Sequence, residues 1–266
     1  MGMFEQIYQD YLLKKNEENR KDRYDGNEGW YHASGAGLCS RKLYFESVEK
    51  AKPTNPPNKS SMRKMRVGTI LHEDIQNSLI LYNNIYNNNI LQDNIKHDIS
   101  QNNITQEYNV KFDVEGEIRL PSLNVRGFYD VVSKDFSADK DAPKVKLYDI
   151  KTTANFSFAR KFSSKLSSPQ ENRNHYLQLG TYGLGLREKY GDVDQMSVIY
   201  YNKDNSTMRE VVVPNMFIDE AKRYWYSINE EHSKGLPGFN FGTSPANAWI
   251  CGYCQFKSRC NPPPKF

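Results

Sequence analysis

Two aspartates and a lysine stand within apolar segments near the middle of this 266-residue chain. Asp130 belongs to the segment 127–132, and Asp149 and Lys151 belong to the segment 145–151. A carboxylate among apolar residues costs folding free energy unless it is paired or binds a metal. Carboxylate oxygens suit Mg²⁺ or Mn²⁺, which lower the pKa of bound water, and a nearby lysine can neutralise charge on a phosphate. The group therefore suits metal-dependent phosphodiester hydrolysis, although a surface hairpin with solvated charges would carry the same residues.

Both segments must form strands for these side chains to meet. Each is short, roughly alternating and rich in β-branched and aromatic residues, which predicts a β-hairpin. Residues i and i+2 of a strand share a face, so Asp149 and Lys151 point the same way. Adjacent strands lie about 4.8 Å apart, so Asp130 reaches the same place if the register allows it.

The remaining elements follow from periodicity and from Gly, Pro, Asn and Ser clusters. We expect helices over 3–22, 61–81, 175–190 and 217–233, a short helix from Cys39 to Phe45, and strands over 106–114 and 196–201. The helix over 3–22 is amphipathic, with apolar positions Phe4, Ile7, Tyr8, Tyr11 and Leu12. Segment 52–61 reads as a linker, 83–103 as an exposed Asn-rich insertion, and 155–174 as a loop. The order predicts an α/β (α+β) fold with one central mixed sheet flanked by helices.

The charge and the distribution of apolar residues limit the classes of protein to which this chain can belong. The formal net charge is +4, which permits a polyanionic partner. The longest apolar runs are too short for a transmembrane helix, and the N-terminal segment is too polar for a secretory signal. We expect a cytoplasmic protein without a membrane partner, bacterial or phage-encoded. Its four cysteines would then be free or metal-bound.

The cysteines lie at the two ends of the chain. Cys251 and Cys254 form a C-x₂-C half-site, Cys260 follows, and Cys39 lies more than two hundred residues upstream. Such a half-site binds zinc or an iron–sulphur cluster, and the spacing does not separate the two. A shared site would tie the ends of the chain together.

Taken in order, these motifs resemble the PD-(D/E)XK nuclease superfamily. More narrowly, they resemble its RecB-like branch with a four-cysteine iron–sulphur cluster, as in the CRISPR-associated exonucleases. The resemblance is carried by five motifs: Gly68–His72, Gly127–Asp130, Asp149–Lys151, Gln178–Tyr182 and the set Cys39, Cys251, Cys254 and Cys260. Each motif alone is weak, but five in the expected order are specific.

The resemblance implies a restriction-endonuclease-like fold and assigns roles to these residues. The hydrolytic Mn²⁺ or Mg²⁺ would be held by His72, Asp130, Asp149 and the carbonyl of Ile150. Lys151, Gln178 and Tyr182 would complete the catalytic set, and the cysteines would bind [4Fe–4S], with zinc as the alternative. From the residues alone, an ordinary helix histidine, helix packing of Gln178 and Tyr182, and an edge-strand lysine stay open.

The resemblance also implies an organisation. We expect one nuclease domain over 1–266, with a PD-(D/E)XK core over 61–234. The iron–sulphur subdomain would combine 24–50 with 235–266. Basic and aromatic residues near the site could guide DNA by charge and stacking, or could form an ordinary solvated surface; these are Arg41, Lys42, Arg160, Lys161, Arg173 and Tyr176.

Two functions remain in view. The first is a metal-dependent deoxyribonuclease, a single-strand exonuclease in DNA processing, recombination or repair, with endonuclease activity as an extension. The second is a catalytically silent DNA-binding partner of a recombination or CRISPR adaptation complex, stabilised by a structural metal cluster. The sequence contains no G-x-x-x-x-G-K-[ST] motif, so unwinding of duplex DNA would need a helicase or recombination protein as partner.

Overall fold

A mixed β-sheet forms the centre of the molecule, as a computed structural model shows for residues 2–24, 29–87, 109–139, 141–162, 172–239 and 250–260. Its strands are β1 (Tyr31–His32), β2 (Val110–Leu120), β3 (Val125–Asp135), β4 (Lys144–Thr153), β5 (Gln195–Asn202) and β6 (Met208–Val213). β2 pairs with β3 from end to end except at Glu115, so β1 and β4 share the other edge of β3. β4 and β5 are parallel, and the β2–β3, β3–β4 and β5–β6 pairs are antiparallel.

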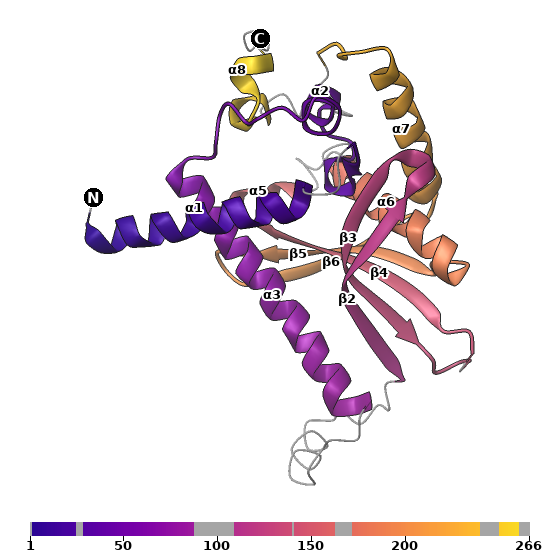
Figure 1. The fold of residues 1–266 in the computed structure, drawn as a ribbon. Coiled ribbons are helices and arrows are strands. Elements are labelled where there is room, and N and C mark those ends of the chain that lie inside the picture. Colours follow the sequence, from indigo (N-terminus) through magenta and orange to yellow (C-terminus); the bar gives the residue numbers. More distant parts are fainter. Residues whose placement is uncertain are drawn as a thin grey trace.

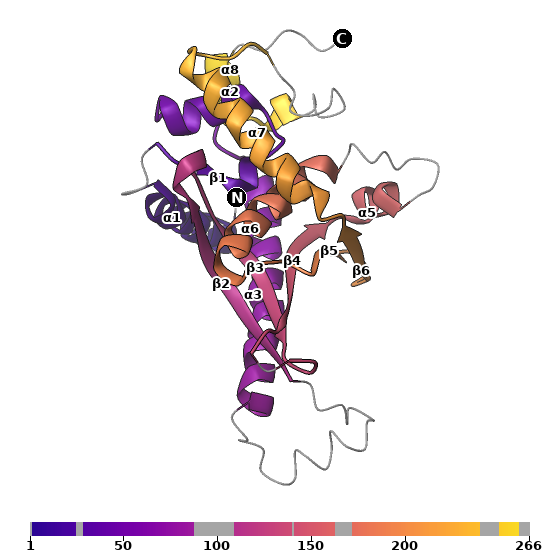
Figure 2. The same cartoon turned by 90° about the vertical axis from the view of Figure 1, so that its right-hand side faces the viewer.

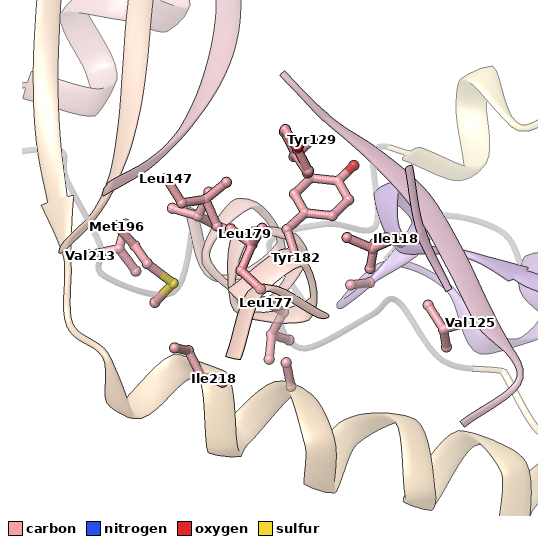
Figure 3. Close-up of a cluster of buried hydrophobic side chains, with 14 of the residues drawn as sticks. Ile118, Val125, Tyr129, Leu147, Leu177, Leu179, Tyr182, Met196, Val213 and Ile218 are labelled. Carbon is pink, nitrogen blue, oxygen red and sulfur yellow. The ribbon is translucent and has the colours of Figure 1, made fainter. Parts of the chain in front are cut away.

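Helices cover both faces of this sheet (Figures 1 and 2). The helices α6 (Arg173–Tyr190) and α7 (Met216–Ser233) lie on one side, and α3 (Lys59–Asn87) lies on the other with α1 (Met3–Tyr24) across it. The main hydrophobic core fills the space between the sheet, α6 and α7, with Leu147, Leu179 and Ile218 among its buried members (Figure 3). The predicted arrangement of a mixed sheet flanked by helices is therefore confirmed.

Several local predictions need correction. The segment 155–174 contains the helix α5 (Asn155–Phe162), whereas we expected a loop; residues 163–171 lie outside the described part. The strand expected over 106–114 is β2, which begins at Val110 and runs to Leu120. The strands β1 and β6 were not predicted, because β1 has two residues and β6 is mostly exposed, without the alternation of a half-buried strand.

The predicted Asn-rich insertion also begins too early. α3 continues to Asn87, and the side chain of Asn83 bonds both the amide and the carbonyl of Phe112, at 3.0 and 2.7 Å. Asn83 thereby fastens the end of α3 to β2. Residues 88–108 lie outside the described part.

The helix α1 is confirmed, but most of its apolar stripe is exposed to solvent and does not pack on a core. Among the α1 side chains that the structure describes, Gln9 and Leu12 are buried, against α3, while Phe4, Ile7 and Tyr11 are exposed. Leu12 lies at the edge of the stripe nearest to Gln9, since consecutive residues turn by about 100°, so the stripe as a whole is turned away from α3. No helix in the described part of the chain combines the length and apolar composition that a membrane crossing needs.

The two ends of the chain pack together near α2 (Ser40–Leu43), the π-helical turn η2 (Tyr44–Val48) and α8 (Lys257–Cys260). The ring of Phe256 is buried against Phe45, with centroids 5.5 Å apart. The carbonyl of Gln255 accepts hydrogen bonds from the amides of Thr54 and Asn55, at 2.8 and 2.9 Å. The two ends of the chain therefore have apolar and backbone contacts with each other.

Candidate active site

The central acids lie where two strands part. The ladder between β3 and β4 ends at Val131 and Tyr148, so the next opposed residues are Asp130 and Asp149. In place of the next ladder bond, the amide of Ile150 donates to Asp130 Oδ2 at 2.6 Å. β4 itself continues beside β5 to Thr153. The separation of β3 from β4 thus opens the sheet at the two carboxylates, where side chains from both faces can reach them.

Asp149 is fully buried and paired with Lys151. The ammonium Nζ of Lys151 lies 2.7 Å from Oδ2 of Asp149 and donates to Oδ1 at 2.9 Å. The amide of Gln178 also donates to Oδ1 at 3.1 Å and lies 3.0 Å from the hydroxyl of Tyr182. Oδ2, although close to the ammonium, accepts no hydrogen bond with proper geometry. The structure therefore brings Asp149, Lys151, Gln178 and Tyr182 into one connected group.

Asp130 faces the helix α3. Nδ1 of His72 lies 3.8 Å from Oδ2 of Asp130. Burial, followed by the charge of Asp149, raises the pKa of Asp130 to about 7. Burial and the charge of Lys151 lower the pKa of His72, which favours the neutral imidazole that metals bind. Asp130 is therefore an acid whose charge is poorly compensated near neutral pH.

A glycine explains how Tyr182 comes so near to β3. A Cβ on Gly127 would lie 2.9 Å from Cε1 of Tyr182 and 2.8 Å from Cβ of Ala33. Tyr182 is buried beside the sheet (Figure 3). The glycine of the Gly127–Asp130 motif therefore makes room for the tyrosine of the Gln178–Tyr182 motif, a link that the sequence alone did not reveal.

A divalent metal fits the chemistry of this site, but the ligands are not gathered. Two carboxylates and a neutral imidazole are suitable donors, and the unbonded Oδ2 of Asp149 is a buried acceptor with spare capacity. However, no three His, Cys, Asp or Glu side chains in the described ranges are placed to hold a metal. The convergence of His72, Asp130 and Asp149 within ligand reach stays a prediction, because the carboxylate of Asp149 points to Lys151 and Gln178.

Two residues of the site were missed by the sequence reasoning. His175 lies one turn before Gln178 on α6, and its Nδ1 is 3.0 Å from the hydroxyl of the buried Tyr200. Burial and the charges of Lys151 and Lys161 keep the pKa of His175 well below its ordinary value. The spacing of three from Gln178 was the available signal. Tyr200 gave none, because its place beside Lys151 is set by the pairing of β4 with β5.

The predicted DNA-contacting residues do not form one group. Arg41 donates to the carbonyl of Pro237 at 2.6 Å, and Lys42 pairs with Glu46 at 3.6 Å, both near the packed chain ends. The others are carried by α5 and α6: Arg160, Lys161, Arg173 and Tyr176. Arg173 pairs with Glu220 at 2.5 Å, Lys161 bonds Asn172, and Tyr176 is half-buried against Phe217. Their role in binding DNA stays a prediction.

The four cysteines come near one another without forming a metal group. All are free thiols. Burial raises the pKa of Cys39, Cys251 and Cys254, and the charges of Cys254 and Cys260 add to this effect at Cys39 and Cys251. The thiols thus lie within electrostatic range of one another, but they are not set as ligands in the described part of the chain. The iron–sulphur centre and its subdomain are not shown.

Comparison with known proteins bears on this site. The model of the PD-(D/E)XK nuclease superfamily matches residues 87–261, which include every motif described above except Gly68–His72 and Cys39. No curated protein sequence matches the chain. The crystal structure of SSO0001 is similar, with a TM-score of 0.50, 17% identity, and coverage of 94% of this chain and 95% of that one. An alkaline exonuclease from Laribacter hongkongensis gives a TM-score of 0.44 and 12% identity, over 81% of this chain and 94% of that one.

Proposed function

Because the chain belongs to the PD-(D/E)XK nuclease superfamily, we propose that it is a metal-dependent deoxyribonuclease that hydrolyses phosphodiester bonds in single-stranded DNA. The observation that carries this proposal is the pairing of the buried Asp149 with Lys151, opposite Asp130 at the point where β3 and β4 part. The buried carboxylate of Asp149 is paired with one ammonium, and the neighbouring, partly buried carboxylate of Asp130 adds negative charge that a divalent cation would balance.

Each residue then has a role. His72, Asp130, Asp149 and the carbonyl of Ile150 would hold Mn²⁺ or Mg²⁺. The metal, when bound, supplies a water of lowered pKa and stabilises charge on the phosphate. Lys151 offers its ammonium to the phosphate, and Gln178 holds Asp149 and Tyr182 in place. The basic residues on α5 and α6 would guide the strand toward the acids.

A cleavage assay tests this function. End-labelled single-stranded and duplex DNA would be incubated with the protein and Mn²⁺, Mg²⁺ or EDTA. We expect cleavage that requires the metal and is lost in Asp130→Asn. Asp135→Asn is the matched control, since Asp135 lies on the same strand away from the site. Metal-independent cleavage, or full activity of Asp130→Asn, would contradict the assignment.

One observation favours the second candidate, a catalytically silent DNA-binding partner. No three ligands are gathered in the described part of the chain, as a silent member of the family would also show. Metal-insensitive DNA binding with no cleavage under any of these conditions would favour this candidate. Such a protein would act beside a helicase or recombination enzyme.

We also propose that Cys39, Cys251, Cys254 and Cys260 bind a structural [4Fe–4S] cluster in a subdomain of residues 24–50 and 235–266, with zinc as the alternative. The free thiols within electrostatic range of one another support it. Anaerobically purified protein would be analysed for iron, sulphide, zinc and visible absorbance, with Cys254→Ala as the variant and the exposed Tyr253→Ala as control. We expect the wild-type protein to contain iron and the Cys254→Ala variant to lack it. Zinc without iron would show that the site binds zinc instead of a cluster. The absence of both elements would contradict a metal site at these cysteines.

A further inference from the structure

An acid outside the recognised motifs lies in a strained position beside the site. The pairing of β2 with β3 is continuous on both sides of Glu115 and Asp130 but leaves out these two residues. Glu115 has a φ of 52°, in the left-handed region that residues other than glycine rarely adopt. Such a conformation persists only where the surroundings impose it, and it is concentrated at functional sites.

Glu115 and the main chain of Asp130 share a hydrogen-bond donor on α3. The amide Nε2 of Gln76 donates to Oε1 of Glu115 at 2.8 Å and to the main-chain carbonyl of Asp130 at 3.3 Å. Gln76 is 5% exposed, so these are buried contacts of an amide that would otherwise lose its hydration. One side chain of α3 therefore contacts both strands at the place where their ladder is interrupted.

The position of Gln76 relates this contact to His72. The two residues are four apart on α3, so they lie on one face of the helix, one turn from each other. Anchoring Gln76 to β2 and β3 sets both the distance and the rotation of this face relative to Asp130.

We propose that Gln76 and Glu115 are a positioning pair that holds α3 against the interrupted β2–β3 ladder and thereby places His72 beside Asp130. The inference rests on the proposed function, because His72 and Asp130 are its expected metal ligands. Neither Gln76 nor Glu115 is proposed to touch the substrate. Removing residues that orient metal ligands through hydrogen bonds typically lowers metal affinity about 10–100-fold.

A double-mutant cycle on metal binding tests the pair without DNA. Mn²⁺ affinity would be measured by electron paramagnetic resonance for the full chain, for His72→Ala, for Gln76→Leu and for the double variant. We expect Gln76→Leu to weaken Mn²⁺ binding about tenfold and His72→Ala to have little further effect in that background. Equal effects of His72→Ala in both backgrounds would overturn the positioning role.

Further variants separate positioning from loss of structure. Glu115→Gln keeps an oxygen that can accept a hydrogen bond from Gln76, so the effects of Gln76→Leu and His72→Ala on Mn²⁺ affinity are expected to remain non-additive in this background. Glu115→Ala removes that oxygen and is expected to make the two effects additive. Gln9→Leu is the matched control, because Gln9 is a buried glutamine that contacts Met62 of α3 far from the site. Loss of the coupling in Glu115→Gln as well would overturn the hydrogen-bonding argument.

The outcomes also distinguish this inference from the function on which it rests. If the wild-type chain binds Mn²⁺ and cleaves DNA but the cycle is additive, only the positioning pair fails. If the wild-type chain binds no Mn²⁺ and cleaves no DNA, the proposed nuclease fails and the pair fails with it.

Discussion

Lys151 is the residue whose role the structure changes most. The family resemblance assigned it only a place in the catalytic set. Its ammonium, however, is the cationic partner of Asp149, whose side chain is fully buried. Removing one member of a buried ion pair leaves an uncompensated charge, which is strongly destabilising. Catalysis and stability are therefore linked at this lysine.

We predict that Lys151→Ala lowers both cleavage and stability. Cleavage should fall about 10²–10³-fold, as for loss of a donor to a developing oxyanion. The free energy of unfolding should also fall, and it should recover in Lys151→Ala combined with Asp149→Asn, because the buried charge is then gone. Urea unfolding and single-turnover cleavage measure the two effects. A double variant less stable than Lys151→Ala would contradict this reasoning.

Asp130 gives a second prediction at this scale. Its folded-state pKa of about 7 lies above its unfolded-state value of 3.8, so its contribution to stability is lost as the pH rises between these values. Asp130→Asn should therefore raise the unfolding temperature of the metal-free protein at about pH 8, where the penalty is complete. Added Mn²⁺ should stabilise the wild-type chain but not this variant.

The check is thermal unfolding with EDTA and with Mn²⁺, using Asp135→Asn as control. The pKa of Asp135 is lowered by hydrogen bonds from Ser137, so its replacement should not stabilise the protein. Equal unfolding temperatures for wild type and Asp130→Asn in EDTA would mean that the Asp130 charge carries no penalty.

At the scale of elements, α6 must lie very close to α7 to present Gln178 and Tyr182 to β4. Gly180 lies between these two residues, and a Cβ there would be 2.1 Å from the carbonyl oxygen of Phe217 on α7. That oxygen belongs to the backbone, so it can yield only if the helix moves. The helix that carries the polar side chains of the site is therefore positioned by a backbone contact on its opposite side.

We predict that Gly180→Ala lowers the free energy of unfolding by about 1–3 kcal/mol, even though alanine is the better helix former. Cleavage should fall as well, because Gln178 moves with α6. Gly238→Ala is the control: a Cβ there meets nothing within 4 Å, and the change should stay within about 0.5 kcal/mol. A neutral Gly180→Ala would show that α7 adapts without cost.

At the scale of the whole molecule, a histidine joins segments from the two ends of the chain. On α7, His232 has its Nδ1 2.8 Å from the hydroxyl of Tyr31 and its Nε2 3.0 Å from Oγ of Ser40. Ser40 follows Cys39 directly, so this bond also anchors the segment that carries the first cysteine. The ends are thus held by a buried polar network in addition to the packing of Phe256.

We predict that this network makes the protein sensitive to acid. Burial lowers the folded-state pKa of His232, so the unfolded chain binds the proton more readily than the folded protein does. The free energy of unfolding therefore decreases as the pH falls below about 6.5. His232→Gln should reduce that slope. Because Asp130 acts with the opposite sign, the measurement is the difference between the two proteins in urea unfolding from about pH 7 to about pH 5. A difference that does not vary with pH would contradict the role of His232.

The sequence by itself determined the order and type of most elements and the candidates for the reactive residues. The hairpin around Asp130 and Asp149, the helices α3, α6 and α7 and the strand β5 followed from local periodicity, because side-chain spacing along one element needs no knowledge of its neighbours. The spacing of Asp149 and Lys151 likewise placed them on one face, as their ion pair confirms.

The tertiary structure decided which of these residues meet. The end of the β3–β4 ladder at Val131, the interruption of β2 at Glu115 and the outward face of α1 depend on contacts between segments distant in sequence. Gln76 shows the difference: its place on the face of His72 could be read from a spacing of four, but its partner Glu115 could not. Register and close approach are set by long-range packing, on which residue spacing within one element has no bearing.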